Sequence, residues 1–370
     1  MNASLNEKLR TVKWGEYKIT QLFKPMTIKR KIKGEDVTEK GTYPAYSSDS
    51  ENNGIVGYYN TPEFICDSKN PVYVVFGDHT RTMSIARNSF SVLDNVKVLR
   101  PYLDNTNVLL FVFSVWKKQI PNLGYKRHWG IAKECLLKLP AKDGKLDLDF
   151  MESFIAELEA ERVAELTDYL TVSGLNYYEL SSEEENALEK LKFVKWNAYK
   201  LTDVFTVKNT SNILARDIVE SSGTVPYLCA GSENNAVSTY INYDEKYIEK
   251  GNCIFIGGKT FVVTYQEKDF YSNDSHNLAL YLKEGVKSKA TFLYMVTCVY
   301  KNLFQKYSWG NSISKSKIQS DIITLPITAD GKIDFDFMEL LISAIQKLVI
   351  KDVVLYADRK LEGTKEVIKH

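Results

Sequence analysis

The stretch KWGEYKITQLF at residues 13–23 returns, 182 positions later, as KWNAYKLTDVF at residues 195–205. The same offset joins the SENN segments at residues 50–53 and 232–235. Each copy closes with Leu-Pro, at residues 139–140 and 325–326, followed by Asp-Gly-Lys and then Asp-Phe-Met-Glu. Ordered matches over this distance indicate one structural unit that is present twice, with divergent sequence between the shared anchors.

The repeat divides the 370 residues into four segments. We expect globular domains at residues 1–140 and 195–326, a connecting helical region at 141–194 and a C-terminal helical region at 327–370. Two domains are also what the chain length suggests. The predicted fold class is α+β, with two repeated mixed α/β domains that are each followed by a long helix.

Within each copy, the residue pattern predicts short strands around one apolar helix. The opening stretch, residues 17–23, fits a strand or a short helix. Strands are expected at residues 72–76, 91–99, 252–256 and 261–265, and core helices at residues 108–118 and 291–304. A last short strand should stop at Pro140 or Pro326, where the Asp-Gly turn redirects the chain.

Long apolar stripes with helical spacing follow both globular segments, at residues 150–170 and 334–361. Helices of these lengths measure about 30 Å and about 40 Å. They either pack on their own domains or form an antiparallel, coiled-coil-like pair, which is the arrangement we predict. A shorter helix is expected at residues 182–192, where Ser182 and Glu185 have the spacing of a capping box.

Charge is distributed unevenly along the chain. Residues 13–140 carry 19 basic and 12 acidic side chains and residues 195–326 carry 15 and 12, whereas residues 141–194 carry 5 and 14. Two basic domains can contact nucleic-acid phosphates, and an acidic linker would stay away from them. The distribution therefore favours nucleic-acid contact by both globular domains.

The composition argues against a membrane or secreted protein. No run of about 18 apolar residues is present, and the first residues lack the apolar segment of a signal peptide. The five cysteines form no Cys-x-x-Cys pair, and the four histidines show no metal-ligand spacing. We expect reduced thiols, a cytoplasmic location and no metal site.

Motifs for catalysis are also missing. An adenine methyltransferase would need a Pro-Pro pair in its active-site motif, and the sequence contains none. Gly258-Lys259-Thr260 resembles the end of a P-loop, but Cys253 stands where the first glycine of the phosphate cradle belongs. Asp67-x-Lys69 lacks the upstream acid of a nuclease site and fits a surface turn. We therefore expect no enzyme activity and no cofactor.

Candidate DNA contacts lie on two loops of each copy, because base reading needs polar side chains that can enter a groove. The first loop follows a buried strand and supplies His79, Thr80 and Arg81, or Lys259 and Thr260 in the second copy. The second mixes aromatic with basic and amide groups, and we align Tyr125 with Tyr307. It supplies Tyr125, Lys126, Arg127 and His128 in the first copy, and Ser308, Trp309, Asn311, Ser312 and Lys315 in the second. A plain hairpin turn and an aromatic packing loop are the structural alternatives.

Two further polar features are less specific. Asn52-Asn53 and Asn234-Asn235 suit adenine edges, but they are identical in copies that should read different bases, so we favour turns with positive φ. The basic run of Lys29, Arg30, Lys31 and Lys33 fits a phosphate contact or a solvated loop.

One frame with two divergent interiors suggests two different recognition surfaces. Two readers about 34 Å apart can sit on one face of duplex DNA, since that is one helical turn. Because the copies differ, we expect a split, asymmetric site. The alternative is a tandem repeat that only binds other proteins.

The repeated anchors resemble a known family. The Lys-Trp-x-x-Tyr-Lys opening, the Ser-Glu-Asn-Asn loop and the junction from Leu-Pro to Asp-Phe-Met-Glu resemble target-recognition domains of specificity (S) subunits. These subunits belong to type I restriction–modification systems and to related type IIB systems. The resemblance covers nearly the whole chain, in both copies.

This resemblance implies a subunit that reads double-stranded DNA and binds two DNA adenine methyltransferase (M) subunits. In full complexes, restriction (R) subunits join them, and methylation and cleavage are done by these partners. Many type I S subunits carry Pro-Pro-Leu-x-Glu-Gln where this chain has Asp-Gly-Lys-x-Asp at residues 143–147. That departure favours the type IIB-like branch.

Overall fold

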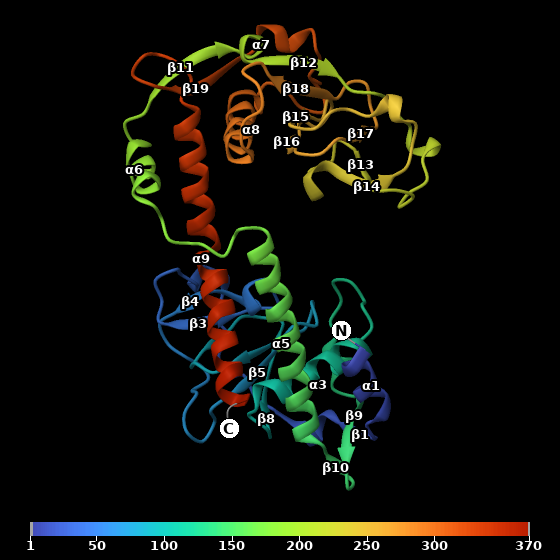
Figure 1. Cartoon of the computed structure of the whole chain (residues 1–370). Coiled ribbons are helices and arrows are strands. Elements are labelled where there is room, and N and C mark those ends of the chain that lie inside the picture. Colours follow the sequence, from blue (N-terminus) through green and yellow to red (C-terminus); the bar gives the residue numbers. More distant parts are fainter. Residues whose placement is uncertain (1–2, 369–370) are drawn as a thin grey trace. The chain divides into compact units, whose positions relative to one another are not determined.

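The computed structural model describes residues 3–368, and in the last helix it describes side chains as far as Glu362. The chain forms two compact units. Unit 1 holds the residues up to Tyr169 together with those from Ala357 onward, and unit 2 holds Leu170–Tyr356. Figure 1 shows both units, with colours that follow the sequence from the N-terminus to the C-terminus.

Unit 1 is built from three small sheets and the helices that cover them. Its sheets have the strand orders β2-β8-β5-β6, β4-β3-β7 and β1-β9-β10. The elements are α1 (Ala3–Thr11), β1 (Trp14–Lys18), α2 (Ile19–Leu22), β2 (Phe23–Pro25), β3 (Tyr43–Tyr46), β4 (Ile55–Tyr59), β5 (Tyr73–Gly77), β6 (Met83–Ala86), β7 (Ser91–Val92), β8 (Val96–Pro101), α3 (Thr106–Gln119), α4 (Trp129–Ala132), β9 (Leu136–Lys142), β10 (Lys145–Leu146) and α5 (Leu148–Val172).

Unit 2 repeats this plan. Its sheets have the orders β12-β18-β15-β16, β14-β13-β17 and β11-β19. The elements are α6 (Ser182–Lys190), β11 (Lys195–Lys200), α7 (Leu201–Val204), β12 (Phe205–Asn209), β13 (Val225–Leu228), β14 (Val237–Ile241), β15 (Cys253–Ile256), β16 (Val263–Gln266), β17 (Tyr271–Ser272), β18 (Leu278–Leu282), α8 (Lys289–Leu303), β19 (Ile322–Ile327) and α9 (Phe335–Ile368). The duplication predicted from the sequence is confirmed.

The core of each unit lies between one sheet and one apolar helix. In unit 1 every residue of β5 is buried, as its continuous apolar run predicts. Trp116 of α3 is fully buried and stacks on Phe23 at 5.4 Å and on Phe76 at 5.7 Å between ring centroids. In unit 2, α8 and β15 supply the same kind of core, with Phe292 and Ile254 buried in one cluster. This packing fixes the ends of β5 and β15, from which the candidate loops leave.

Backbone conformation corrects three of the strand predictions. Residues 91–99 form two strands rather than one, because Asn95 adopts φ 59° between β7 and β8. Phe261 has φ 56°, so β16 begins only at Val263. Pro140 and Pro326 lie inside β9 and β19 and do not end them. Proline lacks only the donor, and the carbonyls of these two prolines still accept hydrogen bonds from Asp147 N at 2.9 Å and Asp334 N at 3.0 Å.

Each long helix begins at an aspartate that caps it. Asp147 accepts a hydrogen bond from Phe150 N, and Asp334 accepts one from Phe337 N, both at 3.0 Å. Both helices are longer than the sequence pattern predicted, with 25 residues in α5 and 34 in α9. Within unit 1, the end of α9 lies against α5, where Lys360 Nζ is 2.6 Å from Glu159 Oε1.

The helix α6 is capped one residue earlier than predicted. Ser181, rather than Ser182, accepts the hydrogen bond from Glu184 N, and the Glu184 side chain accepts one in return from Ser181 N. Glu184 explains this shift by one residue. It is buried and pairs with Lys347 Nζ of α9 at 2.7 Å, which holds it, rather than Glu185, in the capping position. Over residues 3–368, none of the helices is long and apolar enough to cross a membrane.

Candidate nucleic-acid interface

The loops that follow β5 and β15 have the same backbone geometry. Gly77 N donates to Thr82 O at 2.9 Å, and Gly257 N donates to Val262 O at 2.8 Å. Near the end of each turn stands one residue with positive φ, Arg81 at 59° and Phe261 at 56°. His79 therefore occupies the place of Lys259, and Thr80 that of Thr260. One loop shape carries different side chains in the two units.

The second loop of each unit is anchored to the first through the backbone. His128 N donates to Asp78 O at 2.9 Å, and Ile313 N donates to Gly258 O at 3.0 Å. His128 therefore corresponds to Ile313. Counted from this pair, Lys126 and Arg127 correspond to Asn311 and Ser312.

The alignment of Tyr125 with Tyr307 is therefore wrong. Tyr125 is 84% exposed, whereas Tyr307 is buried and donates a hydrogen bond to Asp321 at 2.6 Å. Asp321 is also paired with Lys306. The backbone hydrogen bonds define which positions of the two loops correspond, and Tyr125 and Tyr307 are not corresponding positions.

His128 is also corrected, because it has no surface to offer DNA. Its side chain is fully buried, with Nδ1 2.9 Å from Asp78 O and Nε2 accepting from Leu123 N at 3.0 Å. The buried Asp78 carboxylate accepts hydrogen bonds from His128 N at 2.8 Å and Trp129 N at 2.6 Å. These hydrogen bonds hold the second loop of unit 1 against the first. His128 is therefore not a candidate DNA contact.

Arg81 also has a structural contact. Its guanidinium donates to Ile120 O at 2.9 Å, at the end of α3, and the side chain is half-buried. Thr80 and Thr82 share a hydrogen bond at 2.7 Å between their hydroxyl groups. In unit 2, Thr260 Oγ1 donates to Ala230 O at 2.7 Å. These residues shape the loops, and the side chains of His79 and Lys259 remain at their tips.

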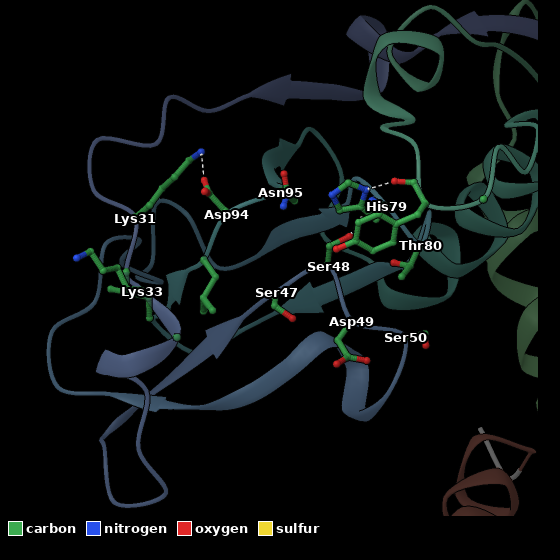
Figure 2. Close-up of a pocket in the computed structure, with 15 residues that line it drawn as sticks. Lys31, Lys33, Ser47, Ser48, Asp49, Ser50, His79, Thr80, Asp94 and Asn95 are labelled. Carbon is green, nitrogen blue, oxygen red and sulfur yellow. Dashed lines mark hydrogen bonds and ion pairs between the residues drawn. The ribbon is translucent and has the colours of Figure 1, made fainter.

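Tyr125 and His79 form a stacked pair at the surface of unit 1. Their ring centroids lie 4.3 Å apart with 5° between the planes. His79 Nδ1 is 2.8 Å from Tyr125 O, so a proton on Nδ1 is donated to that carbonyl. The pair lies beside a cleft of about 770 Å³, which Figure 2 shows. The cleft is lined by hydroxyl, amide, basic and acidic side chains, among them Lys31, Lys33, Ser48, Thr80, Asp94 and Asn95.

The charges around this cleft are mixed. Lys31 Nζ lies 2.6 Å from Asp94 Oδ1. The hydrogen bond and charge of Lys31, together with the charge of Arg127, lower the pKa of Asp94. Lys126 and Arg127 are exposed. The cleft thus joins the basic run near residue 31 to the second loop, a connection that the sequence analysis did not make.

Unit 2 has a related arrangement around Lys259. Its Nζ lies 2.9 Å from Asp274 Oδ2, and His276 Nδ1 lies 2.8 Å from Asp274 Oδ1. Partial burial works against the charged carboxylate, but hydrogen bonds from His276 and Lys259 outweigh it and lower the pKa of Asp274 to about 2. Sequence reasoning missed Asp274 and Asp94, although the two lie 180 positions apart, close to the repeat offset.

The second loop of unit 2 presents a tryptophan. Trp309 is 78% exposed, at the tip of a turn in which Ser308 and Asn311 exchange backbone hydrogen bonds at 3.0 and 3.2 Å. Lys317 Nζ, which the sequence analysis did not single out, donates to Asn311 Oδ1 at 2.8 Å and to Ser312 O at 2.7 Å. Lys315 is exposed beside them.

The duplicated asparagines adopt the turn conformation that the sequence analysis favoured. Asn53 and Asn235 both have φ 53°. The side chains of Asn52 and Asn234 each donate at 3.1 Å to the carbonyl three residues later. Among the residues that the structure describes, no group of three or more His, Cys, Asp or Glu is placed to hold a metal ion.

Comparison with known proteins gives a consistent result. The model of the type I restriction modification DNA specificity domain matches residues 11–168 and again residues 194–355. The type II restriction enzyme BgcI specificity subunit S.BcgI of Heyndrickxia coagulans is 23% identical over an alignment of 348 residues that covers 92% of this chain and 96% of that protein. A crystal structure of the type I restriction-modification system S subunit from M. genitalium shares the fold with a TM-score of 0.61 at 11% identity, over 96% of this chain and 94% of the other. The chain therefore belongs to the family of type I restriction modification DNA specificity domains.

Proposed function

We propose that this chain is the DNA-reading subunit of a restriction–modification complex, and that each unit reads one half of a split, asymmetric site. The observation that carries this proposal is the pair of first loops. Their backbones match, yet His79 stands in unit 1 where unit 2 presents Lys259, and the adjoining second loops expose Tyr125 in unit 1 and Trp309 in unit 2. A common frame with different exposed side chains is what two unlike half-sites require.

The exposed side chains would divide the work by chemistry. Lys126, Arg127 and Lys315 would contact phosphates and set affinity and its salt dependence. Ser308, Asn311 and Ser312 have donors and acceptors of the kind that read base edges. The aromatic faces of Tyr125 and Trp309 would support DNA that the complex distorts.

The chain itself would perform no chemistry and need no cofactor. We propose that it guides two methyltransferase subunits, and in complete assemblies restriction subunits, to the site. Two exposed tryptophans support two equivalent docking surfaces: Trp14, paired with Pro140, is 44% exposed, and Trp196, paired with Pro326, is 45% exposed. Identical partners would need identical contacts, and these side chains are shared by both copies.

The long helices would set the distance between the two half-sites. We propose that α5 and α9 pair antiparallel as a coiled-coil-like spacer, which the ion pair between Lys360 and Glu159 supports. At about 1.5 Å per residue, the 25 residues of α5 span about 38 Å, which is close to one turn of DNA. The Asp-Gly-Lys junction at residues 143–145, together with the likeness to a type II specificity subunit, favours the type IIB-like branch.

Footprinting tests the proposal. The chain, purified with the methyltransferase encoded beside it, should protect two short unlike segments separated by an unprotected spacer. The chain alone should neither methylate nor cut DNA. A complex that protects no split site would refute the proposal and favour a tandem repeat that binds only proteins.

A further inference from the structure

An aspartate stands at the same structural position in both units. Leu93 N donates to Tyr46 O at 2.9 Å, and Asn273 N donates to Leu228 O at 3.1 Å, at the ends of the equivalent parallel pairs β3·β7 and β13·β17. The next residue is Asp94 in unit 1 and Asp274 in unit 2. The two carboxylates are therefore kept where most residues of the neighbouring loops have diverged.

Both aspartates lie among the basic groups of the candidate surfaces. Asp94 lines the same cleft as His79 and Tyr125, with Lys31 at 2.6 Å and with Arg127 close enough to influence its pKa. Asp274 pairs with Lys259, the residue at the tip of the first loop of unit 2.

Asp274 has a local structural contact besides Lys259, because it accepts a hydrogen bond from His276 N at 2.9 Å. For the pair of Lys31 and Asp94, a structural role accounts poorly. Lys31 and Asp94 are 49% and 74% exposed, and ion pairs between such exposed side chains contribute little to stability. A carboxylate on a surface that binds a polyanion also repels the phosphates. It therefore weakens binding unless it makes a favourable contact of its own.

An ionised carboxylate can only accept hydrogen bonds, which limits what it can contact on DNA. Phosphates and the keto groups of guanine and thymine are acceptors, so they offer it nothing. The donors in the major groove are the amino groups N4 of cytosine and N6 of adenine. Both carboxyl groups have lowered pKa values, so both are charged at neutral pH.

We propose that Asp94 and Asp274 are specificity-determining residues, each accepting a hydrogen bond from the amino group of one cytosine or adenine in the half-site of its own unit. The inference rests on the proposed function. Lys31 and Lys259 hold the carboxylates in the free protein and turn to nearby phosphates on binding. The frame thus keeps one reading position common to two otherwise different readers.

The test compares the complex of the full chain and its methyltransferase with its Asp94→Asn and Asp274→Asn variants. Each complex methylates a library of random duplexes, and the methylated sequences are read out. Asparagine keeps the shape of aspartate but can also donate, so keto bases become acceptable. Asp94→Asn should relax the preference at one position of the first half-site about 10-fold and leave the second unchanged. Asp274→Asn should do the reverse, so each variant is the control for the other.

Lys31→Ala and Lys259→Ala are the matched controls for the ion pairs. They break the same pairs but keep the carboxylates, so they should lower methylation evenly without changing the base preference. The inference is overturned if the asparagine variants keep the wild-type site, lose activity evenly at all positions, or behave like the lysine variants. If the wild-type complex selects no split site, the proposed function itself fails.

Discussion

The first loop of each unit is held by buried groups and exposed at its tip. In unit 1, Asp78 and His128 lie inside and connect the two loops, while His79 and Tyr125 stack at the surface. In unit 2 the buried partner is Ile313, and Lys259 is exposed. The exposed side chains can therefore change without altering the shape of the loop, and specificity can diverge on a constant frame.

The basic pair of the second loop provides the first prediction. Replacing both Lys126 and Arg127 by Ala should weaken binding mainly on duplexes that contain the first half-site. If both contact phosphates, the slope of log affinity against log salt should fall by about 0.9 for each. Fluorescence anisotropy of the complex over a salt series measures both effects, with the double replacement of the exposed Lys142 and Lys145 by Ala as a charge-matched control. An equal loss on duplexes with either half-site would contradict the assignment.

The buried histidine provides the second prediction. His128→Ala leaves Leu123 N without its partner and empties a fully buried position, so it should lower the free energy of unfolding of unit 1 by about 2 kcal/mol. Urea unfolding measures this, with the exposed Lys126→Ala as the control. A variant of unchanged stability that binds DNA poorly would restore His128 to the DNA contacts.

At the residue scale, the sequence predicted where the candidate loops lie better than it predicted which of their side chains are exposed. It identified both first loops, because polar groups directly after a buried strand form a local pattern. It could not separate His128 from Lys126 and Arg127, because burial depends on Asp78, 50 positions away. It also mispaired Tyr125 with Tyr307, since the true register is carried by backbone hydrogen bonds.

At the scale of elements, the apolar pattern correctly predicted the helices that bury one face in the core. The core helices begin and end within two residues of the predicted bounds at every end. Both strand breaks coincide with positive φ, at Asn95 and Phe261. Asparagine tolerates this conformation locally, whereas for Phe261 it depends on distant contacts. Phe261 is stabilised there by packing against Tyr307, with ring centroids 5.6 Å apart.

The helix α5 provides a prediction on spacing. Inserting Ala-Glu-Leu-Ala after Arg162 lengthens it by slightly more than one turn, or about 6 Å. If α5 and α9 set the distance between the readers, the spacer should change by one or two base pairs while both half-sites stay the same. Methylation of a random library measures this, and the same insertion after Gly174, beyond α5, is the control. An unchanged spacer would refute the proposed role of the helices.

The repeated tryptophans provide a prediction on assembly. Trp14→Ala or Trp196→Ala should reduce the number of bound methyltransferase subunits from two to one, and the double variant should bind none. The reason is that each substitution removes an exposed indole and with it the apolar contact to one methyltransferase subunit. Native mass spectrometry counts the subunits, and Tyr102→Ala, also exposed, is the control. Two bound partners in every variant would place docking elsewhere.

At the scale of the whole molecule, the sequence was most informative. Two copies of one unit follow from the shared anchors, and the family match over residues 11–168 and 194–355 has the same period. The anchors lie where both units need the same backbone, as at the paired asparagine turns. The side chains between them differ, which is the expected outcome when one frame is used to read two different sequences.

The central claim is that two unlike readers share one chain, and methylome sequencing tests it most directly. A host that expresses this chain with its methyltransferase should carry methyl groups at a single motif made of two different short half-sites with a fixed spacer. A palindromic motif, a motif without a spacer or the absence of any motif that depends on this chain would contradict the account.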